Sequence, residues 1–444
     1  MIDAPAARIT RPAFLDQPEV AAVLAVLPGA RAVGGCVRDA LAGRDAADVD
    51  VAAPFAPEDI ADRLRAAGLK VFETGLAHGT VTAVLNHAPV EVTALRRDVL
   101  TDGRHAVVEW TDDWREDAAR RDFTINAMSL GPDGALFDYF GGRTDLAAGL
   151  VRFVGDPDTR LAEDYLRALR FFRFQARYGR GAPDPAAVAA IRRAVPGLGR
   201  LSAERIWMEL KRILSVPDPL ASLALMAETG VLRAPAVLPE ACLGTLFTRL
   251  IAMGGPPDPL LRLAALLCQG EGTMTVIGQI AGRLKLSGQE RDLVEALADC
   301  TPADAAANRF GMATHLDQPG LRRLLASLHR QWRGLDPRVV LLGRSWLAAA
   351  LPADRWRRSD QADDDPVAWA RLRAAIASEP IPVFPIAGRD VIALGIPPGP
   401  AVGAALDDLR SWWMARGCCD DREACLAELR RRLANGDGGT ALGG

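Results

Sequence analysis

The sequence contains very little lysine, although it is rich in other basic side chains. Only three of its 53 basic residues are lysines (Lys70, Lys211 and Lys285), and the formal net charge at pH 7 is −3. A surplus of arginine at surface positions is what a GC-rich genome produces. The overall charge therefore gives no indication of a nucleic-acid partner, and any such indication has to come from local clusters.

Long apolar runs and paired cysteines are also missing. No stretch approaches the ~20 apolar residues that a membrane-spanning helix needs, and residues 1–14 contain no apolar signal core. The seven cysteines form no CxxC pair. Cys418, Cys419 and Cys425 cluster without a histidine nearby, so we expect neither a disulfide framework nor a metal site there. These absences predict a protein that is not bound to a membrane and lies in the reducing cytoplasm.

The 444 residues and the 49% hydrophobic content predict a folded protein of two to four domains. Over residues 1–150, short strand-like and helix-like segments alternate, which indicates an α/β domain with about five strands. After GDPDTRLAED the strand pattern stops, and helical periodicity continues toward the C-terminus. We therefore expect an α+β protein with an α/β head followed by an all-helical remainder.

A local excess of positive charge follows the predicted head. Between residues 160 and 180, six arginines stand against Glu163 and Asp164, which gives a local charge of +4. Arginine presents a bidentate fork to phosphate that lysine cannot copy. This basic stripe is the first indication of a phosphate-bearing ligand.

Gly34 and Gly35 end a strand-like run and precede a helix-like segment. Such a turn lets the backbone approach a ligand closely, and the start of the helix offers unpaired N–H groups to a phosphate. A plain tight turn explains the pair equally well. The pattern matches neither GxGxxG nor a P-loop, which excludes the dinucleotide-binding and Walker-type classes.

Asp48 and Asp50 lie one residue apart in a valine-rich stretch predicted to be a strand. Alternation places both carboxylates on one face, where they repel each other unless a cation lies between them. Mg²⁺ prefers one or two carboxylates together with substrate phosphates, and a pair of such ions suits phosphoryl displacement. Glu91 is a possible third carboxylate, or a structural glutamate. The alternative for the pair is a solvated edge strand.

Six segments in order, which cover roughly residues 32–214, resemble the bacterial tRNA nucleotidyltransferases that add CCA and their relatives, the bacterial poly(A) polymerases. The segments are GGCVRD, DVD, RRDFTINAMSL, DYFGGRTDL, EDYLRALRFFRFQARYG and LSAERIWMELKRIL. The resemblance implies a nucleotidyltransferase head over residues 1–150, a neck with the nucleotide-recognition helix over 151–215, a helical body over 216–360 and a tRNA-binding tail over 361–444. It also implies that residues 96–117 form the mobile loop with which family members switch from C to A.

The resemblance further implies roles for individual residues. It assigns Asp48 and Asp50 to Mg²⁺. It assigns nucleotide contacts to Gly35, Arg38, Arg121, Asp122, Asp164, Arg167, Arg170 and Arg173. The five histidines are never followed by aspartate, so we expect none of the His-Asp phosphohydrolase domain that some relatives carry.

Asp164 and Arg167 explain how a protein can select a base without a template. At positions i and i+3 they are predicted to be neighbours on one helical face. A carboxylate only accepts hydrogen bonds and a guanidinium only donates them. Cytosine and adenine present an amino donor beside a ring-nitrogen acceptor, whereas uracil and guanine present the reverse. One such pair therefore accepts C and A and rejects U and G.

Together these features predict an enzyme that adds C, C and A to the 3′ end of tRNA from CTP and ATP with Mg²⁺. The alternatives are a poly(A) polymerase on the same fold and an enzyme that adds only CC. Poly(A) polymerases of the family often carry basic extensions, whereas this C-terminus is acidic to neutral. An RNA-binding protein without activity would be expected to lose Asp48 and Asp50, and both are present.

Overall fold

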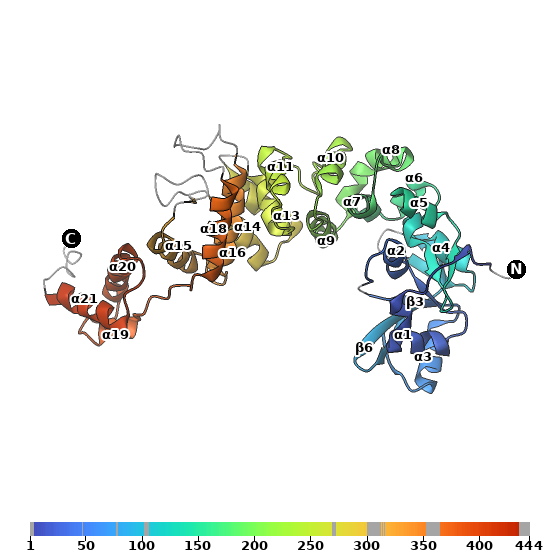
Figure 1. The fold of residues 1–444 in the computed structure, drawn as a ribbon, viewed down its shortest axis with the longest axis horizontal. Helices are drawn as coiled ribbons and strands as arrows, with labels where there is room; N and C mark the ends of the chain where they lie inside the picture. Colours follow the sequence, from blue (N-terminus) through green and yellow to red (C-terminus); the bar gives the residue numbers. More distant parts are fainter. Residues whose placement is uncertain are drawn as a thin grey trace. The chain divides into compact units, whose positions relative to one another are not determined.

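The computed structural model describes residues 4–46, 48–76, 79–101, 106–268, 272–299, 312, 314, 316–351 and 365–434. The chain forms two compact units, Met1–Pro239 and Glu240–Gly444 (Figure 1). The finer division into head, neck, body and tail stays a prediction. Among the described helices, none combines the length and the apolar character that are needed to cross a membrane.

The first unit contains a mixed sheet whose eight strands run in the order β1-β10-β9-β2-β3-β6-β5-β4. All neighbours are antiparallel except β3 and β6, which are parallel. The strands are β1 (Ala7–Arg8), β2 (Arg31–Val33), β3 (Asp50–Ala53), β4 (Lys70–Gly75), β5 (Thr80–Leu85), β6 (Ala88–Ala94), β9 (Met128–Leu130) and β10 (Ala135–Asp138).

Two helices cover one face of this sheet. α1 (Pro18–Val26) and α3 (Pro57–Ala66) pack against each other and against β5 and β6, and they lie together in the lower part of the unit in Figure 1. Val51, Val81 and Val92 are completely buried on the strands. Because side chains alternate along a strand, the residues next to these valines face the opposite side of the sheet.

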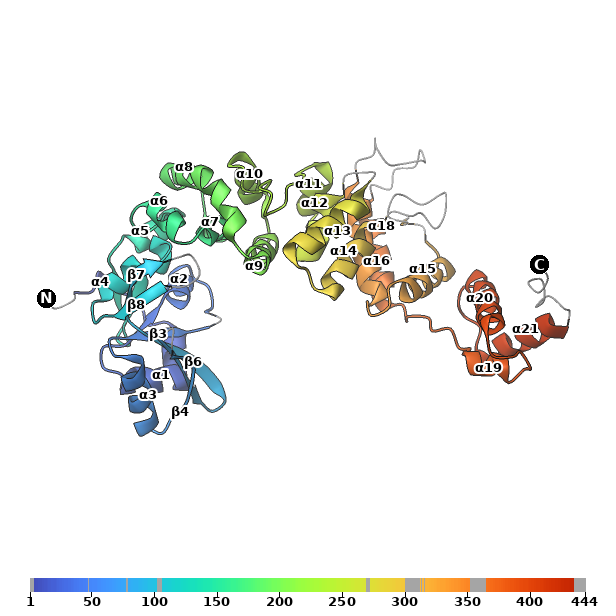
Figure 2. The same cartoon turned by 180° about the vertical axis from the view of Figure 1, so that it is seen from behind.

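The strand count predicted from the sequence is too low. Besides the eight strands of the sheet, the region predicted as a polar loop contains a hairpin of β7 (Arg96–Thr101) and β8 (Ala106–Trp110), which lies beside α4 (Figure 2). The strands β1, β2 and β9 have two or three residues each, which is too short for a periodic pattern. The predicted fold class, a head with a sheet followed by helices, is confirmed.

Helices make up the remainder of the first unit. Aspartate or serine side chains cap the N-termini of α4, α6, α8 and α9 by accepting a backbone N–H, which explains where these helices begin. The helices are α2 (Gly35–Leu41), α4 (Trp114–Ala119), α5 (Gly142–Ala148), α6 (Pro157–Glu163), α7 (Leu166–Tyr178), α8 (Pro185–Ala194), α9 (Ala203–Leu214) and α10 (Leu220–Glu228).

A cluster of buried phenylalanines joins α7 to the sheet-bearing part of the unit. The ring of Phe123 lies 4.9 Å from Phe153 and 5.2 Å from Phe174, measured between centroids. The rings of Phe153 and Phe171 stack at 6.1 Å. Aromatic pairs at such distances stabilise packing beyond their buried area. This cluster fixes the position of α7 relative to residues 122–126.

The described part of the second unit is helical, as expected. α12 packs against α14, α16 packs against α18, and both α11 and α14 contact α16. The helices are α11 (Thr245–Ala252), α12 (Pro259–Leu267), α13 (Thr273–Leu284), α14 (Gly288–Ala298), α15 (Gln318–Gln331), α16 (Pro337–Ala350), α18 (Pro366–Ser378), α19 (Gly388–Ile392), α20 (Pro400–Ala415) and α21 (Arg422–Ala434).

The last three of these helices share a small core of their own. Its buried members are Ile386, Val391, Val402, Leu409, Trp413, Cys418, Cys425 and Leu429. The indole of Trp413 donates to the carbonyl of Asp420 at 3.0 Å and meets the ring of Phe384 edge to face. Trp413 is therefore a core residue of this group of helices.

Candidate active site

The glycine pair forms a tight connection between β2 and α2. Gly34 has φ +70°, a left-handed conformation that L side chains rarely adopt, and its N–H donates to Met128 at 3.3 Å. A Cβ atom at Gly34 would lie 3.0 Å from a guanidinium nitrogen of Arg121. Gly34 is thus required both by the backbone and by the close approach of Arg121, while Gly35 begins the helix.

The parallel junction of the sheet brings two carboxylates together. Asp50 is the first residue of β3 and lies opposite Glu91 of β6. Opposite residues of neighbouring strands share a face, and both side chains are exposed on the face that α1 and α3 do not cover. The sequence correctly indicates that the side chain of Asp50 faces away from that of Val51. It does not reveal that Glu91 of β6 lies opposite Asp50.

Asp48 is also exposed, but the prediction that it lies within the strand is wrong. β3 begins at Asp50, and Asp48 lies in a bend that precedes it. Its charge nevertheless reaches Asp50. Although Asp50 is exposed at the surface, the surrounding protein removes part of its hydration, and this desolvation is the main cause that raises its pKa. The charges of Glu91 and Asp48 raise the pKa further, and Arg121 opposes them.

These surroundings fit a cation. A carboxyl group with a raised pKa beside two other carboxylates carries negative charge that the single neighbouring arginine does not balance. In the described part of the chain, no three His, Cys, Asp or Glu side chains are close enough together to hold a metal ion by themselves. Mg²⁺ does not need such a cage, since it takes most of its ligands from water and substrate phosphates. Asp48 and Asp50 therefore fit Mg²⁺.

Arg121 is held in place by a buried carboxylate. Asp117 of α4 accepts hydrogen bonds from Arg121 at 3.1 and 3.3 Å and from Arg120 at 2.8 Å. Burial alone would raise the pKa of Asp117, but the two guanidinium charges outweigh it and lower the pKa. Asp117 therefore stays ionised and holds Arg121 against the glycine turn.

A second network joins three of the predicted nucleotide contacts. Asn126 accepts from Arg38 at 2.5 Å and donates to Asp122 at 3.0 Å. Asp122 in turn accepts from Arg170 of α7 at 2.6 Å. Burial opposes the charge of Asp122, but Arg170 and the hydrogen bond from Asn126 lower its pKa.

The network continues from Arg38 to the C-terminal end of α7. Arg38 donates to Asp39 at 3.0 Å, and Asp39 also accepts a hydrogen bond from the hydroxyl of Tyr178. The side chain of Arg38 is buried and lies over the rings of Phe174 and Tyr178. These hydrogen bonds couple α2 to α7 at two points along their length.

The predicted continuous helix around Asp164 is interrupted. α6 ends at Glu163 and α7 begins at Leu166, and Asp164 has an extended backbone with φ −155° and ψ 107°. Its side chain accepts from the N–H of Leu166 at 3.0 Å, as aspartates do when they start a new helix. Asp164 and Arg167 are therefore not neighbours on one helical face, and this prediction is wrong.

Each member of this pair has other partners. Asp164 accepts from Arg205 of α9 at 2.7 Å. Arg167 forms an ion pair with Glu163 and donates to the carbonyl of Arg160 at 2.9 Å. A backbone hydrogen bond of 3.0 Å from Arg167 to Asp164 still keeps the two residues close. Their assignment to base selection stays a prediction.

Arg173 of α7 pairs with a buried glutamate of α9. Its Nε lies 3.2 Å from a carboxylate oxygen of Glu209 in α9, which is almost completely buried and also contacts Arg212. Burial lowers the pKa of Arg173 to about 10, and Glu209 opposes this shift. The ion pair joins α7 to α9, which the sequence does not show. The nucleotide contact predicted for Arg173 stays a prediction.

Sequence reasoning missed the residues that position the predicted contacts. They are Asp39, Asp117, Asn126, Glu163, Arg205 and Glu209. All of them except Asp117 stand inside the six segments that carry the resemblance. Their residue types alone give no signal of a structural role, because charges on helices are usually solvated.

Two family models match the chain. The model described as "Poly A polymerase head domain" matches residues 30–152. The model described as "Probable RNA and SrmB- binding site of polymerase A" matches residues 182–242. The first range contains the glycine turn, the three carboxylates and Arg121.

Curated proteins and solved structures are similar over longer ranges. The mitochondrial CCA tRNA nucleotidyltransferase 1 of Danio rerio is 35% identical over 393 residues, which cover 86% of this chain and 83% of the relative. The CCA-adding enzyme of Geobacillus stearothermophilus is 38% identical over 206 residues, or 45% of this chain and 48% of the relative. The crystal structure of the Bacillus stearothermophilus CCA-adding enzyme in complex with CTP superposes with a TM-score of 0.68 at 26% identity, and covers 95% of this chain and 99% of that one.

Proposed function

Because this chain belongs to the family of CCA-adding tRNA nucleotidyltransferases and poly(A) polymerases, we propose that it adds C, C and A to the 3′ end of tRNA. The substrates are CTP, ATP and a tRNA that lacks these nucleotides, and pyrophosphate is the product released. The observation that carries the proposal is the placement of Asp50 beside Glu91, next to Asp48 and to an arginine that lies over a glycine turn.

Asp48 and Asp50 would hold Mg²⁺, with Glu91 as a possible additional ligand. The bound metal would stabilise the negative charge that develops on the transferring phosphoryl group. Arg121 lies beside these carboxylates and is fixed by Asp117, so it is well placed to contact nucleotide phosphates. Gly35 and Arg38 are the other proposed phosphate contacts, and Asp122 and Arg170 would act near the sugar and the base.

Asp164 and Arg167 remain the proposed base-selecting pair. At the start of α7, a backbone hydrogen bond from Arg167 to Asp164 keeps the two residues close. The guanidinium can donate only, and the carboxylate can accept only. To meet a base edge, the two side chains would exchange their contacts with Glu163 and Arg205 for contacts with C or A.

Poly(A) addition is the second candidate function, because one matching model is described as a poly A polymerase head domain. The relatives that match most of the chain are named as CCA-adding enzymes, which favours CCA addition. An enzyme that adds only CC is a third candidate. The proposed cytoplasmic location is independent of these alternatives, and the vertebrate relatives are named as mitochondrial.

Product sizing tests the proposal. Purified protein is incubated with tRNAs that end before CCA, after one C and after two Cs, with CTP, ATP or both. CCA addition predicts two nucleotides with CTP alone, one with ATP on the tRNA ending in CC, and three with both. A ladder of many A residues with ATP alone would favour poly(A) polymerase, and addition of CC without A would favour the partial enzyme.

A deletion within the hairpin separates the candidates further. Residues 102–105 lie outside the described residues, between β7 and β8. Removal of residues 101–105 should leave CC addition intact and abolish addition of the final A, if this segment helps the pocket switch from C to A. In a poly(A) polymerase the same deletion should slow every A addition equally. Complete CCA synthesis by the deleted enzyme would contradict the proposed switch.

A further inference from the structure

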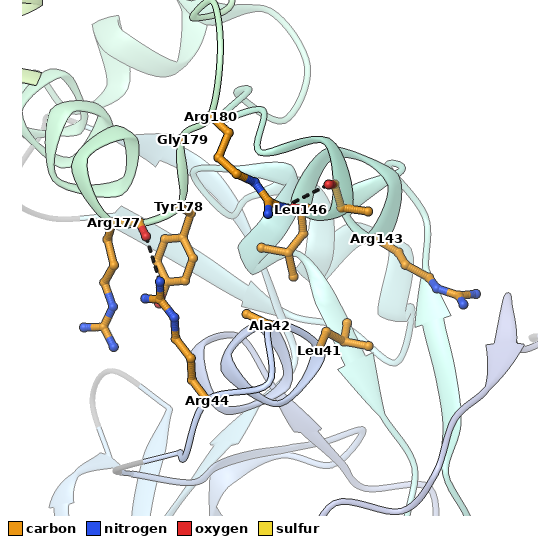
Figure 3. A pocket seen from close by; sticks show the side chains of 10 residues that line it. Leu41, Ala42, Arg44, Arg143, Leu146, Arg177, Tyr178, Gly179 and Arg180 are labelled. Atoms are coloured by element: carbon orange, nitrogen blue, oxygen red, sulfur yellow. Dashed lines mark hydrogen bonds between the residues drawn. The ribbon is translucent and has the colours of Figure 1, made fainter. Parts of the chain in front are cut away.

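A basic pocket lies at the C-terminal ends of α2 and α7, beside α5 (Figure 3). Its volume is about 510 Å³, within the range of pockets that bind small molecules or ligand fragments. Four of its lining residues are arginines and none is acidic. The arginines are Arg44, Arg143, Arg177 and Arg180. None of the predicted site residues lines it.

Two of these arginines are fixed by main-chain contacts. Arg44 donates to the carbonyl of Arg177 at 3.0 Å and lies 4.8 Å above the ring of Tyr178. Arg180 donates to the carbonyl of Ala147 at 2.9 Å, and its own N–H donates to Gly149 at 2.8 Å. A Cβ at Gly149 would lie only 2.8 Å from that nitrogen, so the close approach requires glycine.

Arg177 completes a pair of charges on one side of the pocket. Its guanidinium lies 5.5 Å from the centre of the Tyr178 ring, and Figure 3 shows it extending to the same side as Arg44. Arg143 points away from this pair. Both guanidinium groups therefore lie within 5.5 Å of the centre of the Tyr178 ring, and each can donate to the oxygens of a phosphate group.

The positive charge of this pocket is poorly compensated. Of the six arginines in the basic stripe, Arg160 and Arg167 pair with Glu163, Arg170 pairs with Asp122, and Arg173 pairs with Glu209. Arg177 and Arg180 are the remaining two, and both line the pocket; Arg177 forms a longer ion pair, of 3.8 Å, with Asp39.

Among the described carboxylates, Asp39 alone comes within 4 Å of any of the four pocket guanidiniums, at 3.8 Å from Arg177. Asp39 already accepts hydrogen bonds from Arg38 and Tyr178. The single negative charge of Asp39 therefore cannot neutralise the four arginines. The pocket keeps a net positive charge that would attract an anionic ligand.

The pocket lies about the length of α2 away from Gly35, one of the proposed nucleotide contacts. Leu41 lines it at one end of α2, and Gly35 begins the helix at the other end. Seven helical residues span ~10 Å. One strand of a stacked nucleic acid advances ~3.4 Å per nucleotide. The pocket is therefore about three nucleotides away from Gly35.

We propose that this pocket binds phosphate groups of the RNA strand that is extended, about three nucleotides before its reacting 3′ end. The inference rests on the proposed function. All four arginines are exposed, which favours a phosphodiester backbone because such a strand passes along the protein surface. Free nucleotide or pyrophosphate presents the same phosphate chemistry, and the experiment below separates these sources.

The test compares two double variants that remove the same charge. R44Q/R177Q removes the proposed contacts. R63Q/R65Q is the matched control on α3, where Arg63 lies over the ring of Phe55 and Arg65 pairs with Glu73. Affinity for a tRNA that lacks CCA is measured without nucleotide at several salt concentrations, and melting temperatures verify folding.

Loss of two phosphate contacts should reduce the slope of log affinity against log salt by ~1.4 on a single strand and ~1.8 on a duplex. We expect this change for R44Q/R177Q, together with a weaker affinity at low salt, and an unchanged slope for the control. The single variant R177Q should change the slope by half as much. Because the Arg177 side chain donates no main-chain hydrogen bond, R177Q replaces the double variant in the test if the double variant is unstable. An equal slope in wild type, R177Q and R44Q/R177Q would overturn the proposal.

A second arm measures the affinity of inorganic pyrophosphate without RNA. A weaker affinity in R44Q/R177Q, with an unchanged RNA slope, would overturn the RNA assignment in favour of a free phosphate ligand. The wild-type protein could fail the CCA-addition assay while R44Q/R177Q still reduces the slope of log RNA affinity against log salt. That result would support RNA binding by the pocket and overturn the proposed function. The two failures are therefore distinguishable.

Discussion

Asp50 and Asp122 are aspartates of the same unit, and burial tends to raise the pKa of both. At Asp50 the neighbouring carboxylates Glu91 and Asp48 add to this effect, and the pKa is raised. At Asp122 the charge of Arg170 and the hydrogen bond from Asn126 outweigh it, and the pKa is lowered. Asp117, beside Arg120 and Arg121, behaves like Asp122.

The difference separates two kinds of region. The parallel pair of β3 and β6 gathers negative charge on an exposed face, which costs folding free energy and leaves a place for a cation. The network around Asp117 and Asp122 pairs each buried carboxylate with arginine, which holds the surrounding elements together. Loss of charge at the first region should therefore affect activity, and loss of charge at the second should affect folding.

The largest effect is expected for Asp50→Asn. Because metal ligands provide several kcal/mol of charge stabilisation, nucleotide addition should fall by about 10³-fold or more. The variant should bind tRNA normally and be at least as stable as the wild type, since it removes a repelled charge. Single-turnover assays and thermal denaturation measure both effects. The control Asp59→Asn, on an exposed position of α3, should change neither, and near-normal turnover of the Asp50 variant would disprove the assignment.

The next effect is expected for Asp122→Ala. The substitution leaves Arg170 partly buried without its carboxylate, which should destabilise the fold by about 3 kcal/mol. Chemical denaturation measures the free energy of unfolding. Asp133→Ala breaks an exposed ion pair with Arg8 and should cost less than about 1 kcal/mol. If both variants lost equal stability, the buried network would not be the stronger connection.

A smaller effect is expected for Gly34→Ala. The left-handed backbone costs roughly 1–2 kcal/mol for a residue with a Cβ, and the added atom would push Arg121 away from the turn. Misplacement of a catalytic contact by about 1 Å can lower activity ~10²-fold. Gly68→Ala also introduces a Cβ at a positive φ, but this Cβ meets nothing within 4 Å. A similar loss of activity in both variants would show that the Arg121 contact is irrelevant.

The smallest expected effects are the contributions of individual carboxylate charges to folding stability. These contributions have opposite signs in the two regions. A lowered pKa, as at Asp117 and Asp122, gives stability that is complete above the unfolded value of about 3.9 and is lost as the pH falls through the folded value. The raised pKa of Asp50 destabilises the charged form, and this cost disappears as the pH falls.

Denaturation at several pH values from neutral down to about pH 3 measures this contrast. The free energy of unfolding of Asp122→Ala should be lower than that of the wild type at neutral pH, and this difference should shrink toward low pH. Any higher free energy of unfolding of Asp50→Asn should also approach the wild-type value as the pH falls. Differences that stay constant with pH would mean that the two carboxylates do not act through their charge.

Local chemistry explains which parts of this molecule the sequence could predict. The glycine turn, the two aspartates and the capped helices are contiguous in the chain, so their residue types and spacing are visible directly. The break between α6 and α7 was missed because the side chain of Asp164 bonds to the backbone of Leu166 instead of continuing the helix. The β7–β8 hairpin was missed because its polar residues resemble a loop.

The sequence by itself determined the family, the two carboxylates of the proposed metal site and the basic stripe, because these are properties of residue type and order. Only the tertiary structure decided that Asp50 lies opposite Glu91, and that four arginines of the stripe form close ion pairs while Arg177 and Arg180 line a basic pocket. The physical reason is that ion pairs and strand neighbours are chosen by packing. Charged side chains look alike in sequence, and only burial and distance distinguish a structural ion pair from a charge left for a ligand.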